Sequence, residues 1–128
     1  MNNKPKILYV DDEEMNITVF QLTFSRVFEV LTADSGEKGM EIFTSDPDIK
    51  FVISDMRMPS MNGLEFIRKI RNVCAKIPCS ILSGYQQSPE ILDALDNGEI
   101  VDYLLKPFDK RAIEQLVLKH VNGTTTGN

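Results

Sequence analysis

The chain alternates between short apolar runs and longer segments whose apolar residues recur at helical spacing. The short runs predict five strands, at 7–10, 29–33, 51–54, 79–83 and 103–105. Helical spacing predicts a helix after each strand: 14–27, a helix capped by Ser35, and helices containing 64–70, 91–95 and 113–121. Short, continuous apolar runs are typical of strands buried on both faces. Strands that alternate with helices over short loops form a parallel sheet covered on both sides. The sequence therefore predicts an α/β fold, an open three-layer (αβα) sandwich with right-handed crossovers.

Length and charge limit what the chain can be. Its 128 residues suit one domain, which we place at 1–121, and the Gly, Thr and Asn residues of 122–128 predict a disordered tail or the start of a linker. The net charge of −5 argues against direct contact with nucleic acid or an anionic membrane. The sequence has neither a signal-peptide core nor an apolar run of about 18 residues, so we expect a cytoplasmic location.

Polar side chains follow four of the five predicted strands. Asp11 and Asp12 come after the first strand, and Asp55 comes after the third. Ser83 ends the fourth strand, and Lys106 follows the fifth. In an open parallel sheet, ligands bind beyond the carboxyl ends of the strands. These side chains are therefore expected to lie together at one edge of the sheet.

The residue types at this edge indicate phosphoryl chemistry. Three carboxylates in one place repel one another unless one is protonated or a cation lies among them. Oxygen ligands beside solvent suit Mg²⁺, which keeps several waters. Lys106 is a mobile positive charge of the kind that pairs with phosphate, and the Ser83 hydroxyl can donate a hydrogen bond to an oxyanion. Together they predict a metal-assisted site in which a carboxylate accepts a phosphoryl group.

Five motifs, in order along the chain, resemble those of the receiver domains of two-component response regulators (CheY-like domains). The motifs are 9–13 (YVDDE), 54–59 (SDMRMP), 61–63 (MNG), 83–84 (SG) and 103–108 (YLLKPF). The resemblance extends from about Lys6 to Val121, nearly the whole chain. It implies a flavodoxin-like, doubly wound sheet with strand order 2-1-3-4-5.

The resemblance also implies a role for each site residue. Asp55 would accept a phosphoryl group from a histidine kinase or a phosphotransfer protein. Asp11, Asp12 and Asp55 itself would hold Mg²⁺, with the Arg57 backbone carbonyl as a further ligand, and Lys106 would bridge to the phosphoryl oxygens. Apart from this transfer to itself and the later loss of the group, the domain would not be an enzyme.

Further roles concern the response to phosphorylation. Ser83 and Tyr103 would form the switch: Ser83 moves toward the phosphoryl group and Tyr103 turns inward, changing the surface of the fourth helix, fifth strand and fifth helix. Arg57 and Tyr85, two residues beyond Asp55 and Ser83, would tune the lifetime of the phosphoryl group. The partner that reads the switch is unknown: an effector domain, a downstream protein, or a second copy in a phosphorylation-dependent homodimer.

Other interpretations use the same residues. The acidic run after the first strand could simply favour a helix N-terminus, and Tyr103 could be ordinary packing. A degenerate receiver would keep the fold as a phosphate-independent interaction module. A hydrolase of the haloacid dehalogenase type also combines a nucleophilic Asp with Lys and Mg²⁺, but its nucleophile follows the first strand. The chain could be a stand-alone receiver or the N-terminal module of a longer protein.

Overall fold

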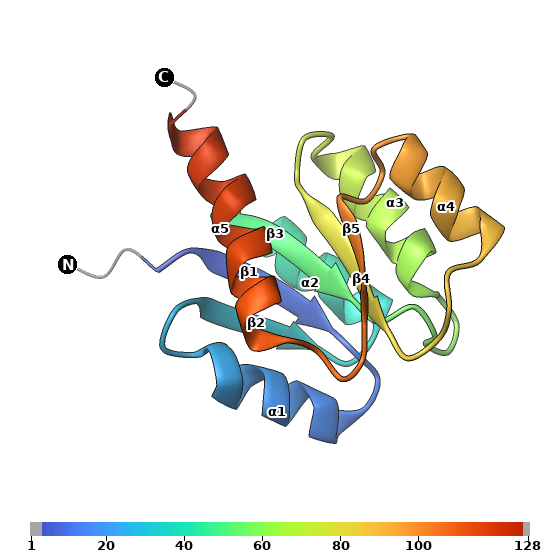
Figure 1. The fold of residues 1–128 in the computed structure, drawn as a ribbon, viewed down its shortest axis with the longest axis horizontal. Helices are drawn as coiled ribbons and strands as arrows, with labels where there is room; N and C mark the ends of the chain where they lie inside the picture. Colours follow the sequence, from blue (N-terminus) through green and yellow to red (C-terminus); the bar gives the residue numbers. More distant parts are fainter. Residues whose placement is uncertain (1–3, 127–128) are drawn as a thin grey trace.

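Strands and helices alternate without exception in this computed structural model, which describes residues 4–126 and their side chains through Val121 (Figure 1). The strands are β1 (Lys6–Val10), β2 (Glu29–Ala33), β3 (Ile49–Ser54), β4 (Cys79–Ser83) and β5 (Asp102–Leu105). The helices are α1 (Glu14–Phe24), α2 (Gly36–Ser45), α3 (Gly63–Val73), α4 (Pro89–Asp96) and α5 (Lys110–Thr126). The predicted alternation is confirmed.

The five strands form one parallel sheet in the order β2-β1-β3-β4-β5. This is the predicted flavodoxin-like order, with β1 and β3 as neighbours near the centre. Helices α1 and α5 cover one face of the sheet, and α2, α3 and α4 cover the other (Figure 1). The predicted three-layer sandwich is therefore confirmed.

Each face of the sheet carries its own apolar core. Leu8 and Val10 of β1 point to the core under α2, α3 and α4, whereas Ile7 and Tyr9 point to the core under α1 and α5. All four side chains are at most 1% exposed. Because both faces are covered, neither needs polar residues, which explains the continuous apolar runs in the sequence.

Side-chain caps fix where helices begin at the functional edge of the sheet. The Ser35 hydroxyl accepts a hydrogen bond from the Lys38 amide at 3.1 Å, as its predicted capping role requires. Asn62 and Glu65 form a reciprocal capping box at the start of α3. Ser88 caps α4, and Pro89 occupies its first turn. The amide hydrogen that proline lacks would have no partner within the helix at this position.

Two predicted helix ends differ from the structure. Helix α1 ends at Phe24 rather than Val27, because the amides of Val27 and Phe28 both donate to the Phe24 carbonyl oxygen and turn the chain. This turn carries Phe28 into the core, where it is 1% exposed. At the other end of the chain, the backbone of α5 continues to Thr126, beyond the predicted domain end at Val121. Extending a formed helix requires less free energy than starting one, so the Gly- and Thr-rich residues after Val121 can continue α5. Residues 127–128 of the predicted tail lie outside the described residues.

Candidate functional site

The carboxyl ends of β1, β3, β4 and β5 meet at one edge and bring the predicted polar residues together. The Asp55 amide donates to the carbonyl oxygen of Val10 at 2.8 Å, so Asp55 lies beside Asp11, the first residue after β1. The Lys106 amide donates to the Ser83 carbonyl oxygen at 2.8 Å. The backbone pairing of the sheet therefore determines which side chains meet.

Three carboxyl groups share this edge. Oxygen atoms of Asp11, Asp12 and Asp55 all lie within 4.8 Å of one another. Asp11 is fully buried, Asp55 is 8% exposed and Asp12 is exposed to solvent. Oxygen ligands that are open to water on one side suit a hard divalent cation. The cluster could therefore hold a metal ion.

Lys106 compensates part of this negative charge. Its Nζ lies 2.8 Å from Oδ2 of Asp11 and 3.5 Å from Oδ2 of Asp55. Burial alone would lower the pKa of Lys106, but the hydrogen bond to Asp11 and the charge of Asp55 outweigh it, and the pKa is raised. Lys106 therefore remains an ammonium group between two carboxyl groups.

The environment of Asp55 disfavours its charge. Burial raises the pKa of the Asp55 carboxyl group, and the nearby Asp11 carboxylate raises it further, while Lys106 opposes both effects. The remaining oxygen, Oδ1, accepts a hydrogen bond from the Met56 amide at 2.8 Å. A cation bound here would relieve the repulsion that Lys106 alone does not remove.

A cavity of about 500 Å³ opens over Asp55. Arg57 and Tyr85 line it from opposite loops, and the guanidinium carbon of Arg57 lies 3.7 Å from the centroid of the Tyr85 ring. At this distance the two side chains form a cation–π pair. The residues predicted to tune the phosphoryl lifetime thus contact each other beside the predicted acceptor.

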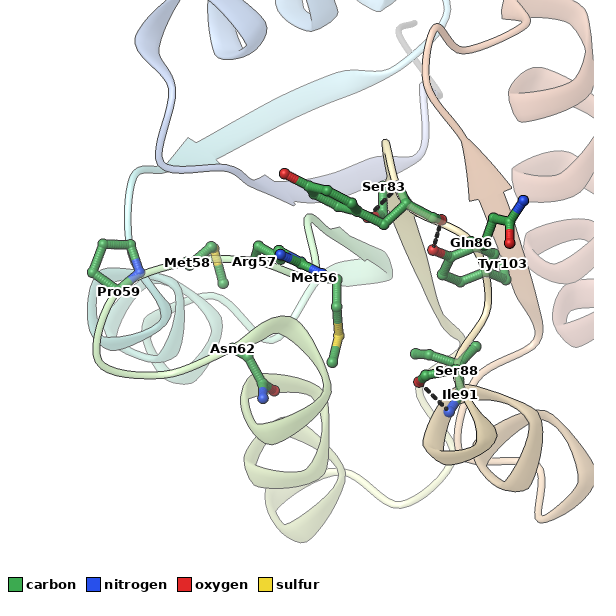
Figure 2. Close-up of a pocket in the computed structure, with 11 residues that line it drawn as sticks. Met56, Arg57, Met58, Pro59, Asn62, Ser83, Gln86, Ser88, Ile91 and Tyr103 are labelled. Atoms are coloured by element: carbon green, nitrogen blue, oxygen red, sulfur yellow. Dashed lines mark hydrogen bonds between the residues drawn. The ribbon is translucent and has the colours of Figure 1, made fainter.

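Ser83 and Tyr103 line a neighbouring cavity of about 490 Å³, which also contains Arg57 (Figure 2). Ser83 is fully buried, and its hydroxyl accepts from the Tyr85 amide at 3.3 Å. Tyr103 is 8% exposed, and its hydroxyl donates to the Tyr85 carbonyl oxygen (Figure 2). Among the described residues, the Ser83 hydroxyl makes no hydrogen bond to Asp55 or to the side chain of Lys106. Ser83 and Tyr103 are therefore linked to each other through Tyr85.

The sequence pattern of the response regulator receiver domain matches residues 7–118. This chain belongs to that family. Receiver domains are the regulatory domains of two-component systems, which agrees with the function class that the motifs predicted.

Relatives in other organisms support this assignment, and they differ from one another in how much of their length matches this chain. A chemotaxis protein CheY homolog of Campylobacter jejuni is 31% identical over 126 residues, which is 95% of either chain. The hydrogenase transcriptional regulatory protein HoxA of Cupriavidus necator is 30% identical over 102 residues, but the match spans only 21% of HoxA. The crystal structure of a response regulator receiver domain protein from Clostridium thermocellum superposes with a TM-score of 0.88, at 29% identity and 96% and 98% coverage.

Two residues of this receiver domain contact the site but were not predicted from the sequence. Tyr9 donates its hydroxyl hydrogen to Oδ2 of Asp11 at 2.7 Å, and Nδ2 of the Asn16 side chain donates to the same oxygen at 3.2 Å. Tyr9 lies in an apolar run, where its ring suggested only packing, although a buried tyrosine hydroxyl needs a partner. Asn16 comes from α1, one turn past the acidic motif, and no spacing rule indicated it.

No helix in the described part of the receiver domain is long and apolar enough to cross a membrane.

Proposed function

We propose that the chain accepts a phosphoryl group on Asp55 from the phosphohistidine of a histidine kinase or phosphotransfer protein. In the proposal, Mg²⁺ is held by Asp11, Asp12, Asp55 and the backbone carbonyl of Arg57. The observation that carries it is the position of Asp55: its carboxyl group is 8% exposed, 3.5 Å from the Lys106 ammonium and within 4.8 Å of two other carboxylates. A protein donor of this kind places the reaction in the cytoplasm.

The chemistry is a displacement at phosphorus. An oxygen of the Asp55 carboxylate forms a bond to the phosphorus atom as the phosphorus–nitrogen bond of the donor breaks, and the electron pair of that bond stays on the imidazole. When bound, Mg²⁺ supplies charge neutralisation for the transferring oxygens. Lys106, already an ammonium group at this edge, can pair with a phosphoryl oxygen and orient the group. The carboxylates of Asp11 and Asp12 supply the oxygen ligands that Mg²⁺ prefers.

A groove beside α1 supports a protein as the donor. The groove has a volume of about 660 Å³ and is lined by Tyr9, Met15, Asn16, Val19, Thr23, Lys106, Pro107 and Phe108. Met15 is 77% exposed and Val19 is 47% exposed, so apolar surface lies open directly beside Lys106 of the site. A donor that delivers a phosphohistidine to Asp55 would bury this surface. Met15→Glu should therefore slow transfer from a phosphotransfer protein more than the reaction with acetyl phosphate, which needs no docking surface.

Phosphorylation would be read through Ser83 and Tyr103. The added group brings about 1.5 to 2 negative charges and new acceptor oxygens toward which the Ser83 hydroxyl can turn. Because Ser83 and Tyr103 both bond to the backbone of Tyr85, a shift of this loop reaches Tyr103. We expected Tyr103 to turn inward only on phosphorylation, yet it is buried already. Phosphorylation would thus shift the population of an accessible arrangement and change the α4–β5–α5 surface.

Other functions fit less well. A phosphate-independent interaction module would need neither Lys106 nor the buried pair of carboxyl groups, and all are present and in contact. A haloacid dehalogenase-type hydrolase carries its nucleophile after the first strand. Here the residue after β1 is Asp11, whose carboxylate is occupied by four donors, whereas Asp55 after β3 faces the cavity.

Beryllofluoride, which binds aspartate as an analogue of the phosphoryl group, tests the proposal. We expect beryllofluoride with Mg²⁺ to shift the backbone amide NMR signals of Asp55, Ser83 and Tyr103 and those of α4. Asp55→Asn, which keeps the shape of the side chain, should show no such shifts. Shifts confined to the neighbourhood of Asp55 would leave phosphoryl binding intact but contradict the proposed switch. No shift in the wild-type protein would contradict phosphoryl binding itself.

A further inference from the structure

The Asp11 carboxylate is fully buried and unusually well supplied with hydrogen-bond donors. Its Oδ2 accepts from the Tyr9 hydroxyl at 2.7 Å, from Nζ of Lys106 at 2.8 Å and from Nδ2 of Asn16 at 3.2 Å. Its Oδ1 accepts from the Glu13 amide at 2.9 Å. Lys106 is therefore one of three side chains that compete for a single oxygen atom.

The proposed function requires Lys106 to give up part of this contact. Its Nζ is closer to Asp11, at 2.8 Å, than to Asp55, at 3.5 Å. To pair with a phosphoryl oxygen on Asp55 it must move away from Asp11. A buried carboxylate that loses its ammonium partner is costly unless other donors remain. Something must therefore keep Asp11 satisfied and in place.

Tyr9 is held rigidly enough to do so. It is 1% exposed, and its ring stacks on Phe20 with the centroids 4.0 Å apart and the planes 5° from parallel. The ring therefore cannot turn the hydroxyl elsewhere. In this position the hydroxyl lies 2.7 Å from Oδ2 of Asp11 and donates to it. A phenylalanine would fill the same space without this donor.

We propose that Tyr9 is a positioning residue of the phosphorylation site: its hydroxyl fixes the orientation of the Asp11 carboxylate at the metal site and keeps Oδ2 satisfied when Lys106 moves to the phosphoryl group. This inference rests on the proposed function. Asn16 assists from α1, but its side chain is partly exposed and its contact is longer. Hydrogen-bond partners behind metal ligands commonly set the affinity of a site by orienting the ligand.

Tyr9→Phe isolates the hydroxyl because it leaves the ring in place. We expect it to raise the Mg²⁺ dissociation constant by about tenfold, measured by isothermal titration calorimetry. At saturating Mg²⁺, its dissociation constant for beryllofluoride should also rise, because Lys106 is then needed at Asp11. Asn16→Ala, at the protein surface, should weaken Mg²⁺ binding by a smaller factor, and it serves as the test if Tyr9→Phe does not fold.

A control separates positioning from general stability. Phe28→Leu destabilises the same core, since Phe28 is 1% exposed, but Phe28 contacts no residue of the site among the described interactions. It should bind Mg²⁺ as the wild-type protein does. Unchanged affinities in Tyr9→Phe and Asn16→Ala, or an equal loss in Phe28→Leu, would overturn the role of Tyr9. If the wild-type protein itself bound neither Mg²⁺ nor beryllofluoride, the proposed function would fail as well.

Discussion

The guanidinium carbon of Arg57 lies 3.7 Å from the centroid of the Tyr85 ring, and both side chains line the cavity that contains Asp55. Such a pair at the protein surface contributes about 0.5–1 kcal/mol. Under the proposed function, both side chains would flank a phosphoryl group on Asp55 and the water that hydrolyses it. The pair is therefore placed to control how long the phosphoryl group survives.

Removing either partner should shorten that lifetime. We predict that Arg57→Ala and Tyr85→Ala speed dephosphorylation about two- to fivefold, the factor that corresponds to ~0.5–1 kcal/mol. The rate of phosphorylation by acetyl phosphate should change less. Decay of the phosphorylated protein, followed by intact mass, measures the lifetime, and Tyr85→Phe, which keeps the aromatic ring, is the matched control. Equal lifetimes in all of these proteins would contradict a role for the pair.

Gly63 allows α3 to begin directly against the loop that carries Asp55. A Cβ atom at this position would collide with the Asp55 carbonyl oxygen and lie 3.1 Å from Cδ1 of Ile81. We predict that Gly63→Ala destabilises the fold by about 1–3 kcal/mol and also reduces phosphorylation, because the backbone of Asp55 must move. Gly84→Ala is the control for stability, since a Cβ there meets no atom within 4 Å. Urea denaturation compares them, and equal stability of the two variants would contradict the prediction.

Much of the fold and of the site follows from the sequence because two local features determine them: the apolar runs and the residues that directly follow each run. Continuous apolar runs predicted buried strands, and residues directly after those strands had to share an edge. Tyr9 shows the limit of this approach: the pattern identified a core side chain but not the partner of its hydroxyl. That partner, Asp11, is set by the rotamer of Tyr9 and its stacking on Phe20, which no local spacing encodes.

The remaining differences have non-local causes as well. The end of α1 at Phe24 depends on how Phe28 packs beneath the helix. The inward position of Tyr103 depends on the backbone of the β4–α4 loop, whose carbonyl group at Tyr85 accepts its hydrogen bond. The sequence made Ser83 and Tyr103 candidates for the switch but did not predict the buried position of Tyr103.

The raised pKa of Asp55 predicts a pH-dependent effect on stability. Its main cause is burial, so the folded protein binds the Asp55 proton more tightly than the unfolded chain does. The ionised group therefore destabilises the fold as the pH rises through its folded-state pKa. Asp55→Asn should be more stable than wild type at about pH 7 without Mg²⁺, with a smaller difference at about pH 5. Urea denaturation in EDTA at both values tests this, and a wild-type protein more stable than the variant at the higher pH would contradict it.

Addition of Mg²⁺ should reduce the stability difference between Asp55→Asn and the wild-type protein. A ligand that binds only the folded protein stabilises it by about 1.4 kcal/mol when its concentration is ten times the dissociation constant. The wild-type protein should therefore gain stability with Mg²⁺, and Asp55→Asn, which lacks one carboxylate, should gain less. An equal gain in both proteins would show that the ion binds elsewhere.

Two buried serines provide a matched test of hydrogen bonding in the sheet. Ser80 and Ser54 are both fully buried, but Oγ of Ser80 has no hydrogen-bond partner among the residues that the structure describes, whereas Oγ of Ser54 donates to the Asp55 carbonyl oxygen at 2.8 Å. Removing an unpaired hydroxyl relieves its desolvation, so Ser80→Ala should match or exceed the stability of the wild type. Ser54→Ala should lose about 1 kcal/mol. Thermal denaturation compares them, and a larger loss in Ser80→Ala would indicate a partner such as bound water.

The intact mass of the protein after incubation with acetyl phosphate and Mg²⁺ tests the central claim most directly. We predict the addition of one phosphoryl group to the wild-type protein, and none to Asp55→Asn or to the wild type in EDTA. An adduct that persists in Asp55→Asn would show that another residue is the acceptor. If the wild-type protein acquired no phosphoryl group, the proposed reaction would be wrong and the chain would be a receiver domain that acts without phosphate.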